Sequence, residues 1–301
     1  MISQGNPSVE ALRIIAESTF TDVDRSPENL PKLREETRAF IAPAVERVLR
    51  STNVSTHETI VAGVKCLEVL PPERSADWRI LYGFGGGFVQ GSPFEDLTIA
   101  APLCAMTGAR VIIPEYRLAP EHPWPAAIDD GFAVYEAMAG TKFALVGESA
   151  GGNWALSLIL RAMDERLALP GAAALLSPWC DLTNSGDSQV FNDGRDPSLT
   201  TKGSIEAAAL YSGGNALNDP KISPINGTFD ATFPPCIITT GTRDLLMSQA
   251  ARLSTVLRSR GTHIDLRVWD GLWHVFEWDD RLPEAQHSLK EIANFLSEQM
   301  G

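Results

Sequence analysis

The chain has 301 residues, of which 44% are hydrophobic and 21% are charged, and its formal net charge is −13. This length and composition are typical of one large globular α/β domain, or of a core domain with an insertion. The acidic balance and the lack of a Lys/Arg cluster exclude nucleic acid as an expected partner, because phosphate binding needs a basic surface.

The cysteines and the N-terminus indicate the cellular compartment. The four cysteines have no paired spacing, which predicts buried thiols in a reducing compartment and neither a disulfide framework nor a metal site. They are Cys66, Cys104, Cys180 and Cys236. The first residues lack a signal peptide's basic start and apolar core, and no apolar run approaches the roughly 20 residues of a membrane span. We therefore expect a cytoplasmic protein with no membrane partner.

Residues 8–50 have the pattern of two helices. Apolar side chains recur there every three to four residues among charged ones. Pro31 is placed to begin the second helix, since a first-turn residue needs no N–H group. Because these helices precede every strand, we expect residues 1–50 to be part of a helical cap.

Short apolar runs follow at regular distances and predict one sheet. Residues 58–70 are expected to hold two antiparallel edge strands. Later strands are expected at 79–82, 110–113, 143–146, 172–176, 236–240 and 264–269. Continuous apolar strands alternating with helices are typical of a mostly parallel sheet, here of eight strands, with helices on both faces.

Residues 183–225 interrupt this alternation. They are rich in Asn, Asp, Gly, Ser and Pro, with one helical patch at 202–211. We expect an insertion that forms the cap together with residues 1–50, over a catalytic domain of residues 51–182 and 226–301. Ligands of such sheets bind beyond the carboxyl ends of the strands, which is where the following motifs lie.

The strongest motif follows the run at 143–146. That run ends in Gly147-Glu148-Ser149-Ala150-Gly151, and a helix-forming stretch comes next. Gly-x-Ser-x-Gly between a strand and a helix is typical of a nucleophile elbow, which lifts the serine Oγ clear of the sheet. Small residues are needed on either side because this turn crowds its own backbone. Ser149 is therefore the candidate nucleophile.

A serine hydroxyl needs a base, which is most often histidine. His274 is the candidate, because its loop lies between the last strand and the last helix, at the carboxyl edge of the sheet. We interpret the histidines beside the edge strands and on the last helix as surface residues. They are His57, His263 and His287.

The base in turn needs an acid that fixes its tautomer and stabilises the imidazolium ion. Asp244 is the candidate, because it follows the strand predicted at 236–240 and lies one strand before His274. The order Ser, Asp, His is that of α/β-hydrolases. Three rivals lie close to the histidine in sequence and are expected to be solvated or helix-capping. They are Glu277, Asp279 and Asp280.

Three consecutive glycines, Gly85 to Gly87, follow the strand predicted at 79–82. The bare N–H groups of such a loop can approach the oxyanion of a tetrahedral intermediate. A phosphate-binding loop is the competing interpretation. It is disfavoured because the Gly-Lys-Ser/Thr ending and the spacing of a dinucleotide-binding loop are both missing.

Together these motifs resemble the hormone-sensitive-lipase family of α/β-hydrolases, bacterial carboxylesterases with a His-Gly-Gly-Gly loop and a Gly-Asp-Ser-Ala-Gly-type elbow. The matching segments span roughly residues 79–280 and are Gly85–Phe88, Tyr116–Pro123, Gly147–Asn153, Ser177-Pro178, Asp244 and His274. The resemblance implies the α/β-hydrolase fold with a helical cap, and no metal or cofactor. It implies oxyanion donors at the N–H groups of Gly86, Gly87 and Ala150, and it places His122 in a structural loop.

The chain departs from the family at three positions. Phe84 stands where a histidine braces the family's loop by hydrogen bonds, so we expect packing to hold the loop here and Phe84 to narrow the acyl side. Glu148 replaces the usual aspartate of the elbow and is expected to be structural. Ser248 stands where a second acidic residue often follows the catalytic aspartate.

These observations predict a serine carboxylesterase that forms an acyl-enzyme with small-molecule esters of short to medium chain length. Aromatic residues at the strand ends indicate a tight apolar pocket, with Phe84, Phe88, Trp179 and Trp273 as candidates. Lactone hydrolysis and amide hydrolysis are alternatives on the same triad. A non-catalytic ligand receptor is a remote alternative, disfavoured by the presence of His274. The resemblance further implies a homodimer through the last strand, 264–269.

Overall fold

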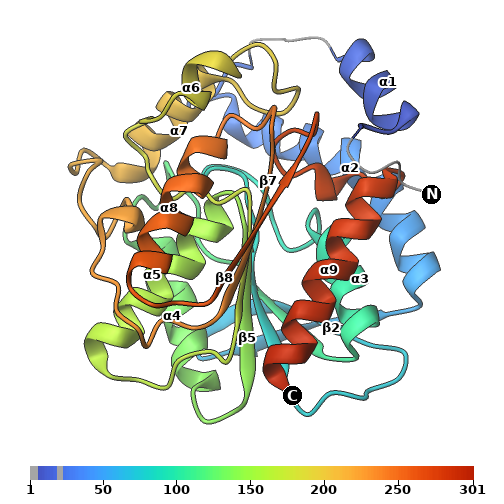
Figure 1. Ribbon diagram of the computed structural model, residues 1–301, viewed down its shortest axis with the longest axis vertical. Helices are drawn as coiled ribbons and strands as arrows, with labels where there is room; N and C mark the ends of the chain where they lie inside the picture. The colour runs from blue at the N-terminus through green and yellow to red at the C-terminus, as the bar shows by residue number, and fades with distance from the viewer. Residues whose placement is uncertain (1–5, 19–22) are drawn as a thin grey trace.

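The computed structural model, which describes residues 6–18 and 23–301, is built around one sheet of eight strands. In chain order the strands are Ser55–Val61 (β1), Val64–Leu70 (β2), Arg79–Gly83 (β3), Arg110–Pro114 (β4), Phe143–Glu148 (β5), Ala173–Leu176 (β6), Cys236–Gly241 (β7) and Ile264–Trp269 (β8). Their spatial order is β1-β2-β4-β3-β5-β6-β7-β8 (Figure 1). β2 pairs antiparallel with β1 and β4, and the other pairings are parallel. The predicted fold class is confirmed.

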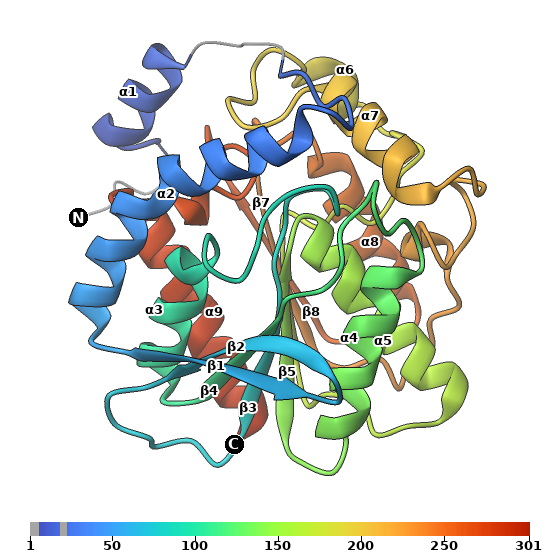
Figure 2. The same ribbon diagram turned by 180° about the vertical axis from the view of Figure 1, so that it is seen from behind.

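Helices cover both faces of the sheet (Figures 1 and 2). Helices α3 (Leu97–Thr107) and α9 (Pro283–Met300) pack together on one face. The other face carries α4 (Ala126–Met138), α5 (Ala150–Glu165) and α8 (Met247–Ser259). All residues of β5 are buried, as expected for a central strand between two helical layers.

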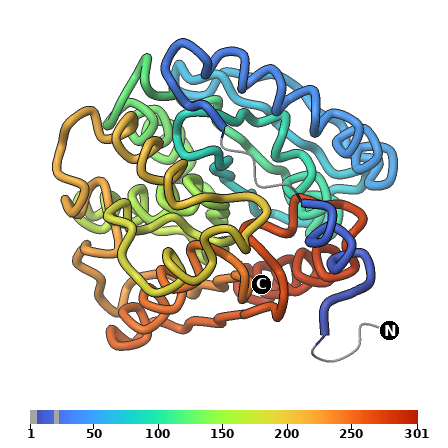
Figure 3. Tube along the Cα trace, turned by 90° about the horizontal axis from the view of Figure 1, so that it is seen from above, coloured from blue at the N-terminus to red at the C-terminus, as the bar shows by residue number. Residues whose placement is uncertain are grey.

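The two segments predicted as a cap lie at the end of the sheet where the parallel strands finish (Figures 1 and 2), and Figure 3 shows the molecule from that end. The first contains α1 (Val9–Glu17) and α2 (Leu30–Thr52), which has Pro31 in its first turn as predicted. Residues 1–5 and 19–22 of the predicted cap lie outside the described residues. The second contains α6 (Ser188–Phe191), α7 (Thr201–Ser212) and a 3₁₀ turn at Pro224–Asn226. That the two segments act as one cap stays a prediction.

Arg34 connects α2 to two loops of the catalytic domain. Its Nε donates to the carbonyl oxygen of Val89 at 2.8 Å, and its Nη2 donates to that of Ala119 at 2.9 Å. Both terminal nitrogens also pair with Glu121 at 2.8 Å. One guanidinium group therefore fixes the start of α2 to residues that follow β3 and β4.

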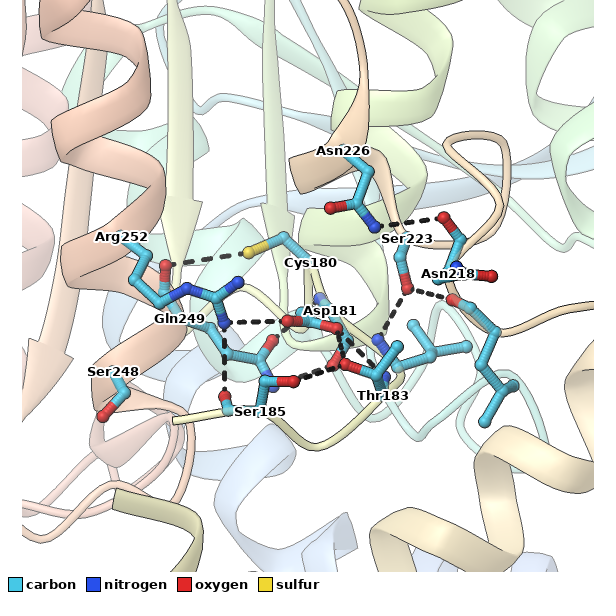
Figure 4. A network of polar contacts seen from close by, with 12 residues as sticks. Cys180, Asp181, Thr183, Ser185, Asn218, Ser223, Asn226, Ser248, Gln249 and Arg252 are labelled. Atoms are coloured by element: carbon cyan, nitrogen blue, oxygen red, sulfur yellow. Dashed lines mark hydrogen bonds and ion pairs between the residues drawn. The ribbon is translucent and has the colours of Figure 1, made fainter. Parts of the chain in front are cut away.

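A polar network connects both ends of the 183–225 insertion to the catalytic domain (Figure 4). The side-chain amide of Gln249 in α8 accepts from the N–H of Asp181 and donates to its carbonyl oxygen, both at 2.9 Å. Arg252 pairs with the buried Asp181 carboxylate at 2.8 Å. Ser223, near the end of the insertion, accepts from the N–H of Leu182 at 2.8 Å. These contacts hold the two ends of the insertion side by side.

Three further predictions concern the whole chain. The four cysteines are buried and free, as predicted. β8 forms one edge of the sheet, and the homodimer through this strand stays a prediction. Across residues 6–18 and 23–301, every helix is too short or too polar to cross a membrane.

Candidate active site

Ser149 lies in the tight turn between β5 and α5, with φ 53° and ψ −117°. A non-glycine residue at positive φ is strained by about 1–3 kcal/mol and persists only where its surroundings enforce it. Here a Cβ atom on Gly147 would overlap the carbonyl oxygen of Gly151, and one on Gly151 would overlap that of Gly83. The turn therefore needs both flanking glycines, as predicted. The Ser149 N–H donates to the Leu176 carbonyl oxygen at 2.9 Å, which joins the turn to β6.

The structure brings Ser149, His274 and Asp244 into one hydrogen-bonded chain. His274 Nε2 lies 2.9 Å from Ser149 Oγ, and His274 Nδ1 lies 3.1 Å from Asp244 Oδ1. Asp244 is fully buried, and Ser149 and His274 are 8% and 6% exposed. When Nδ1 carries the proton toward Asp244, the lone pair of Nε2 faces the serine hydroxyl, which is the tautomer that a general base requires.

Hydrogen bonds hold the Asp244 carboxylate in its ionised form. Thr240 Oγ1 donates to Oδ2 at 2.7 Å, and the N–H of Leu246 donates to Oδ1 at 2.8 Å. Burial by itself raises the pKa of Asp244, but the facing His274, the Ser177 hydroxyl and the N–H of Leu246 reverse this and leave the pKa lowered. Burial likewise lowers the pKa of His274, and Asp244 reverses that effect, so its pKa is raised. The pair is therefore suited to receive a proton from Ser149.

Two residues of the insertion brace the Asp244 loop. Asn192 Nδ2 donates to the carbonyl oxygens of Asp244 and Thr242 at 2.8 and 3.1 Å. The buried Asp196 carboxylate accepts from the N–H of Leu245 at 2.8 Å. Sequence analysis missed both, because they lie in an Asn-, Asp- and Gly-rich stretch that is typical of exposed loops.

The three predicted oxyanion donors have free N–H groups in the described chain. Gly86 and Gly87 follow β3 with φ of 97° and 65°. Ala150 is the first residue of α5, so its N–H has no partner within the helix. Neither these loops nor the side chains of the described residues supply an acceptor for the three groups. They are available to a developing negative charge near Ser149.

Aromatic stacking braces the loop in which Phe84 replaces the family's histidine. The Phe84 ring stacks on Tyr116, with centroids 3.9 Å apart and an interplanar angle of 3°. The Tyr116 hydroxyl also donates to the carbonyl oxygen of Phe84 at 2.6 Å. Phe88 stacks on Tyr211 of α7 at 3.9 Å. Aromatic packing thus helps to hold this loop, alongside the hydrogen bonds from Tyr116 and from Arg34. Narrowing of the acyl side by Phe84 stays a prediction.

Two of the aromatic pocket candidates lie beside the reacting groups. The N–H of Trp179 donates to the carbonyl oxygen of Ser149 at 2.9 Å. Its ring lies 3.9 Å from where a Cβ atom of Gly87 would stand. Trp273 precedes His274 and packs in a small apolar cluster with Ala11 of α1. Both tryptophan side chains are buried.

The remaining histidines lie away from this chain of hydrogen bonds and are exposed. His57 lies within β1 rather than before it, His263 precedes β8, and His287 is on α9. His122 lies in the loop after β4, where its N–H donates to the Leu118 carbonyl oxygen at 2.9 Å. The surface interpretation is confirmed for the first three.

Of the three acidic rivals to Asp244, one does not behave as predicted. Glu277 is fully buried rather than solvated, and it caps no helix. It accepts from the hydroxyl groups of Thr239 and Ser288, both at 2.8 Å, because β7 and α9, which carry these residues, converge on it. The other two form ion pairs with surface arginines. These pairs are Asp279–Arg281 and Asp280–Arg47.

Comparisons with known proteins identify the fold and the family of this chain. A family profile of the α/β hydrolase fold matches residues 80–278. An esterase of Acinetobacter venetianus is 31% identical over 245 residues, which cover 79% of this chain and 80% of that protein. An acetyl-hydrolase of Streptomyces hygroscopicus is 28% identical over 267 residues, covering 87% and 89%. The crystal structure of a hormone-sensitive lipase from a metagenome library superposes with a TM-score of 0.87 at 30% identity, covering 97% of each chain. The chain therefore belongs to the hormone-sensitive-lipase family of α/β hydrolases, and it is a carboxylic ester hydrolase.

Proposed function

We propose that the protein is a serine carboxylesterase with Ser149 as nucleophile, His274 as general base and Asp244 as the orienting acid. The hydrogen-bonded chain from Ser149 Oγ through the imidazole to the Asp244 carboxylate carries this proposal. The raised pKa of His274 and the lowered pKa of Asp244 support it, because both favour the ion pair that forms when the serine loses its proton.

The reaction has two steps. In acylation, Ser149 Oγ adds to the ester carbonyl carbon while its proton moves to His274 Nε2. The carbonyl oxygen becomes an oxyanion, which the N–H groups of Gly86, Gly87 and Ala150 stabilise. Collapse of this intermediate breaks the ester C–O bond, and the alcohol leaves with the proton from His274.

Deacylation repeats the same chemistry with water. His274 takes a proton from a water molecule as its oxygen adds to the acyl carbonyl carbon. The bond to Ser149 Oγ then breaks, and the serine recovers its proton from His274. The carboxylic acid is released and the free enzyme is restored.

Short- to medium-chain esters are the proposed substrates. The buried Trp179, whose N–H donates to the carbonyl oxygen of Ser149, supports a small acyl group. A Cβ atom on Gly87 would stand only 3.2 Å from the Ala207 Cβ of α7, so the insertion lies close to the donor loop. The similarity to an acetyl-hydrolase supports the same size range.

Substitution of the nucleophile tests this function directly. Ser149→Ala is expected to lower kcat for p-nitrophenyl acetate and butyrate by on the order of 10⁶-fold, because loss of a triad serine removes covalent catalysis. Ser254→Ala is the matched control, since this buried serine of α8 has no hydrogen-bond partner in the described chain. Unchanged turnover in Ser149→Ala would refute the assignment.

A substrate screen tests the chain length. We expect kcat/KM to be highest for acetate and butyrate esters and to fall for octanoate and laurate esters. Lactones and anilides in the same screen measure the two alternative activities. A preference for the long-chain esters would contradict the proposed tight pocket.

A further inference from the structure

Two buried carboxyl groups lie behind the loop that carries Gly86 and Gly87. Glu148, the residue before Ser149, is 3% exposed, and Asp96, the residue before α3, is 1% exposed. Each carboxyl group shifts the pKa of the other, so the two groups lie close together. The proposed triad uses neither residue, and carboxyl groups are rarely buried without a specific partner.

A hydrogen bond between two carboxyl groups requires a proton. Trp278 Nε1 donates to Asp96 Oδ1 at 3.0 Å. Asp96 Oδ2 is buried and has no ordinary hydrogen-bond partner in the described part of the chain. Two carboxylates are acceptors only, so one of the pair must be protonated to donate to the other. A proton on Glu148 supplies a donor to Asp96 Oδ2, and the buried Tyr82 hydroxyl beside Asp96 is a second available donor.

The protonation states follow from the surroundings of each group. Burial, and then the nearby charge of Asp96, raise the pKa of Glu148 well above its ordinary value. Burial raises the pKa of Asp96 to about 7, and the hydrogen bond from Trp278 opposes this rise. As the pH rises above about 7, Asp96 becomes the carboxylate and Glu148 remains the carboxylic acid.

Glu148 contacts the oxyanion loop at Gly85, next to the first proposed donor. A Cβ atom on Gly85 would overlap Glu148 Oε1, so the carboxyl group lies directly against the backbone there. The Gly85 backbone lies close enough to Glu148 to oppose the rise of its pKa. The Glu148 carboxyl group therefore lies against the oxyanion loop and close to Asp96, and Glu148 is the residue immediately before Ser149.

We propose that Glu148 and Asp96 share one proton and that this pair positions the N–H groups of Gly86 and Gly87 relative to Ser149. The inference rests on the proposed oxyanion role of these two glycines. Trp278 holds Asp96 from the loop that also carries His274. The pair thus links the elbow, the oxyanion loop and the loop of the base, and both residues are positioning residues rather than catalytic ones.

The groups around the pair disfavour loss of its last proton. Tyr82 of β3 interacts with both carboxyl groups, and Tyr116 lies near them after β4. Glu95, which accepts from the Ser92 hydroxyl, acts on Asp96, and the buried Glu277 acts on Glu148. The two glutamates make a second negative charge on the pair unfavourable, whereas the neutral Tyr82 hydroxyl lowers the pKa of Asp96.

Two substitutions of nearly equal size separate hydrogen bonding from packing. Glu148→Gln keeps a donor for Asp96 and an acceptor for Gly85, so we expect kcat close to that of the wild type. Glu148→Met fills the same space without polar atoms. It is expected to lower kcat by on the order of 10²-fold, near the effect of losing one oxyanion donor, with KM almost unchanged.

Controls distinguish this inference from the proposed function. The burst of p-nitrophenol should remain stoichiometric in Glu148→Met, because Ser149 and His274 are intact. Glu284→Gln, which changes a buried carboxyl group of α9 that binds Ser8, is expected to keep wild-type kcat. Activity in Ser149→Ala would overturn the proposed function itself.

Two results would overturn the inference while the proposed function stands. One is wild-type kcat in Glu148→Met. The other is a loss in Glu148→Gln as large as in Glu148→Met, since the ionised carboxylate would then be the required form. If Glu148→Met does not fold, Trp278→Phe removes the donor to Asp96 and leaves the elbow unchanged. It should lower kcat several-fold with KM unchanged, and wild-type kcat in this variant also overturns the inference.

Discussion

Replacement of Tyr116 by Phe removes one hydroxyl from the aromatic brace of the oxyanion loop and changes nothing else in shape. That hydroxyl donates to the carbonyl oxygen of Phe84 at 2.6 Å, and both groups are buried. A buried acceptor left without its donor destabilises a protein by about 1–3 kcal/mol. The stacking of Phe84 on residue 116 survives, so the loop should shift slightly rather than unfold.

The expected effects are measurable in two assays. For a chain of this length, a loss of about 1–3 kcal/mol lowers Tm by roughly 2–5 °C. We expect kcat to fall several-fold, which is less than the about 10²-fold loss of a whole oxyanion donor, because Gly86 and Gly87 keep their N–H groups. Thermal unfolding and p-nitrophenyl butyrate turnover report the two effects.

Tyr211→Phe is the matched control within the same stack. The Tyr211 ring stacks against Phe88, and its buried hydroxyl has no hydrogen-bond partner in the described residues. Its removal should leave Tm unchanged or raise it, because no bond is lost and no polar group stays desolvated. Equal losses of Tm in the two variants would refute the reasoning, since stacking alone would then account for the brace.

Two further predictions concern pH. The base must be neutral, and the pKa of His274 is raised, so kcat/KM should fall as the pH drops through a midpoint above the ordinary histidine value of about 6.5. Asp244→Asn removes the charge that raises this pKa. It should move the midpoint of this fall in kcat/KM to lower pH and reduce kcat by on the order of 10⁴-fold. An unchanged midpoint would contradict this explanation. Asp96 has its pKa raised to about 7 by burial, so its contribution to stability is present at low pH and lost as the pH rises toward 7. Relative to the wild type, Asp96→Asn should therefore gain unfolding free energy on the order of 4 kcal/mol between about pH 4 and 7. The unfolding free energies of both proteins can be measured by denaturant titration at each pH. A difference between them that stays constant over this range would contradict the burial of an ionisable Asp96.

The sheet and the candidate triad were predictable because both have local signals. Apolar runs of strand length became β3 to β8, and the expected edge pair became β1 and β2. The Gly-x-Ser-x-Gly turn marked Ser149, and residues that follow parallel strands gather at one edge of a sheet. His274 and Asp244 could be chosen for that reason alone.

The supporting residues were not predictable, because burial of a polar group depends on elements distant in sequence. Asn192 and Asp196 lie in a stretch whose composition is that of a loop, and only the packing of α6 against α8 brings them to Asp244. Glu277 follows a loop and looks solvated until β7 and α9 enclose it. Asp96 has no periodic or motif signal at all.

Arg34 limits how freely the N-terminal segment can be exchanged between related esterases. Its fork of donors matches three acceptors that belong to the catalytic domain, Val89, Ala119 and Glu121. A chimaera with a foreign N-terminus therefore inherits two loops shaped for a guanidinium group that is missing. Lysine would not restore the match, because an ammonium group cannot reproduce the planar fork. A graft that respects this boundary carries residue 34 and its three acceptors as one unit.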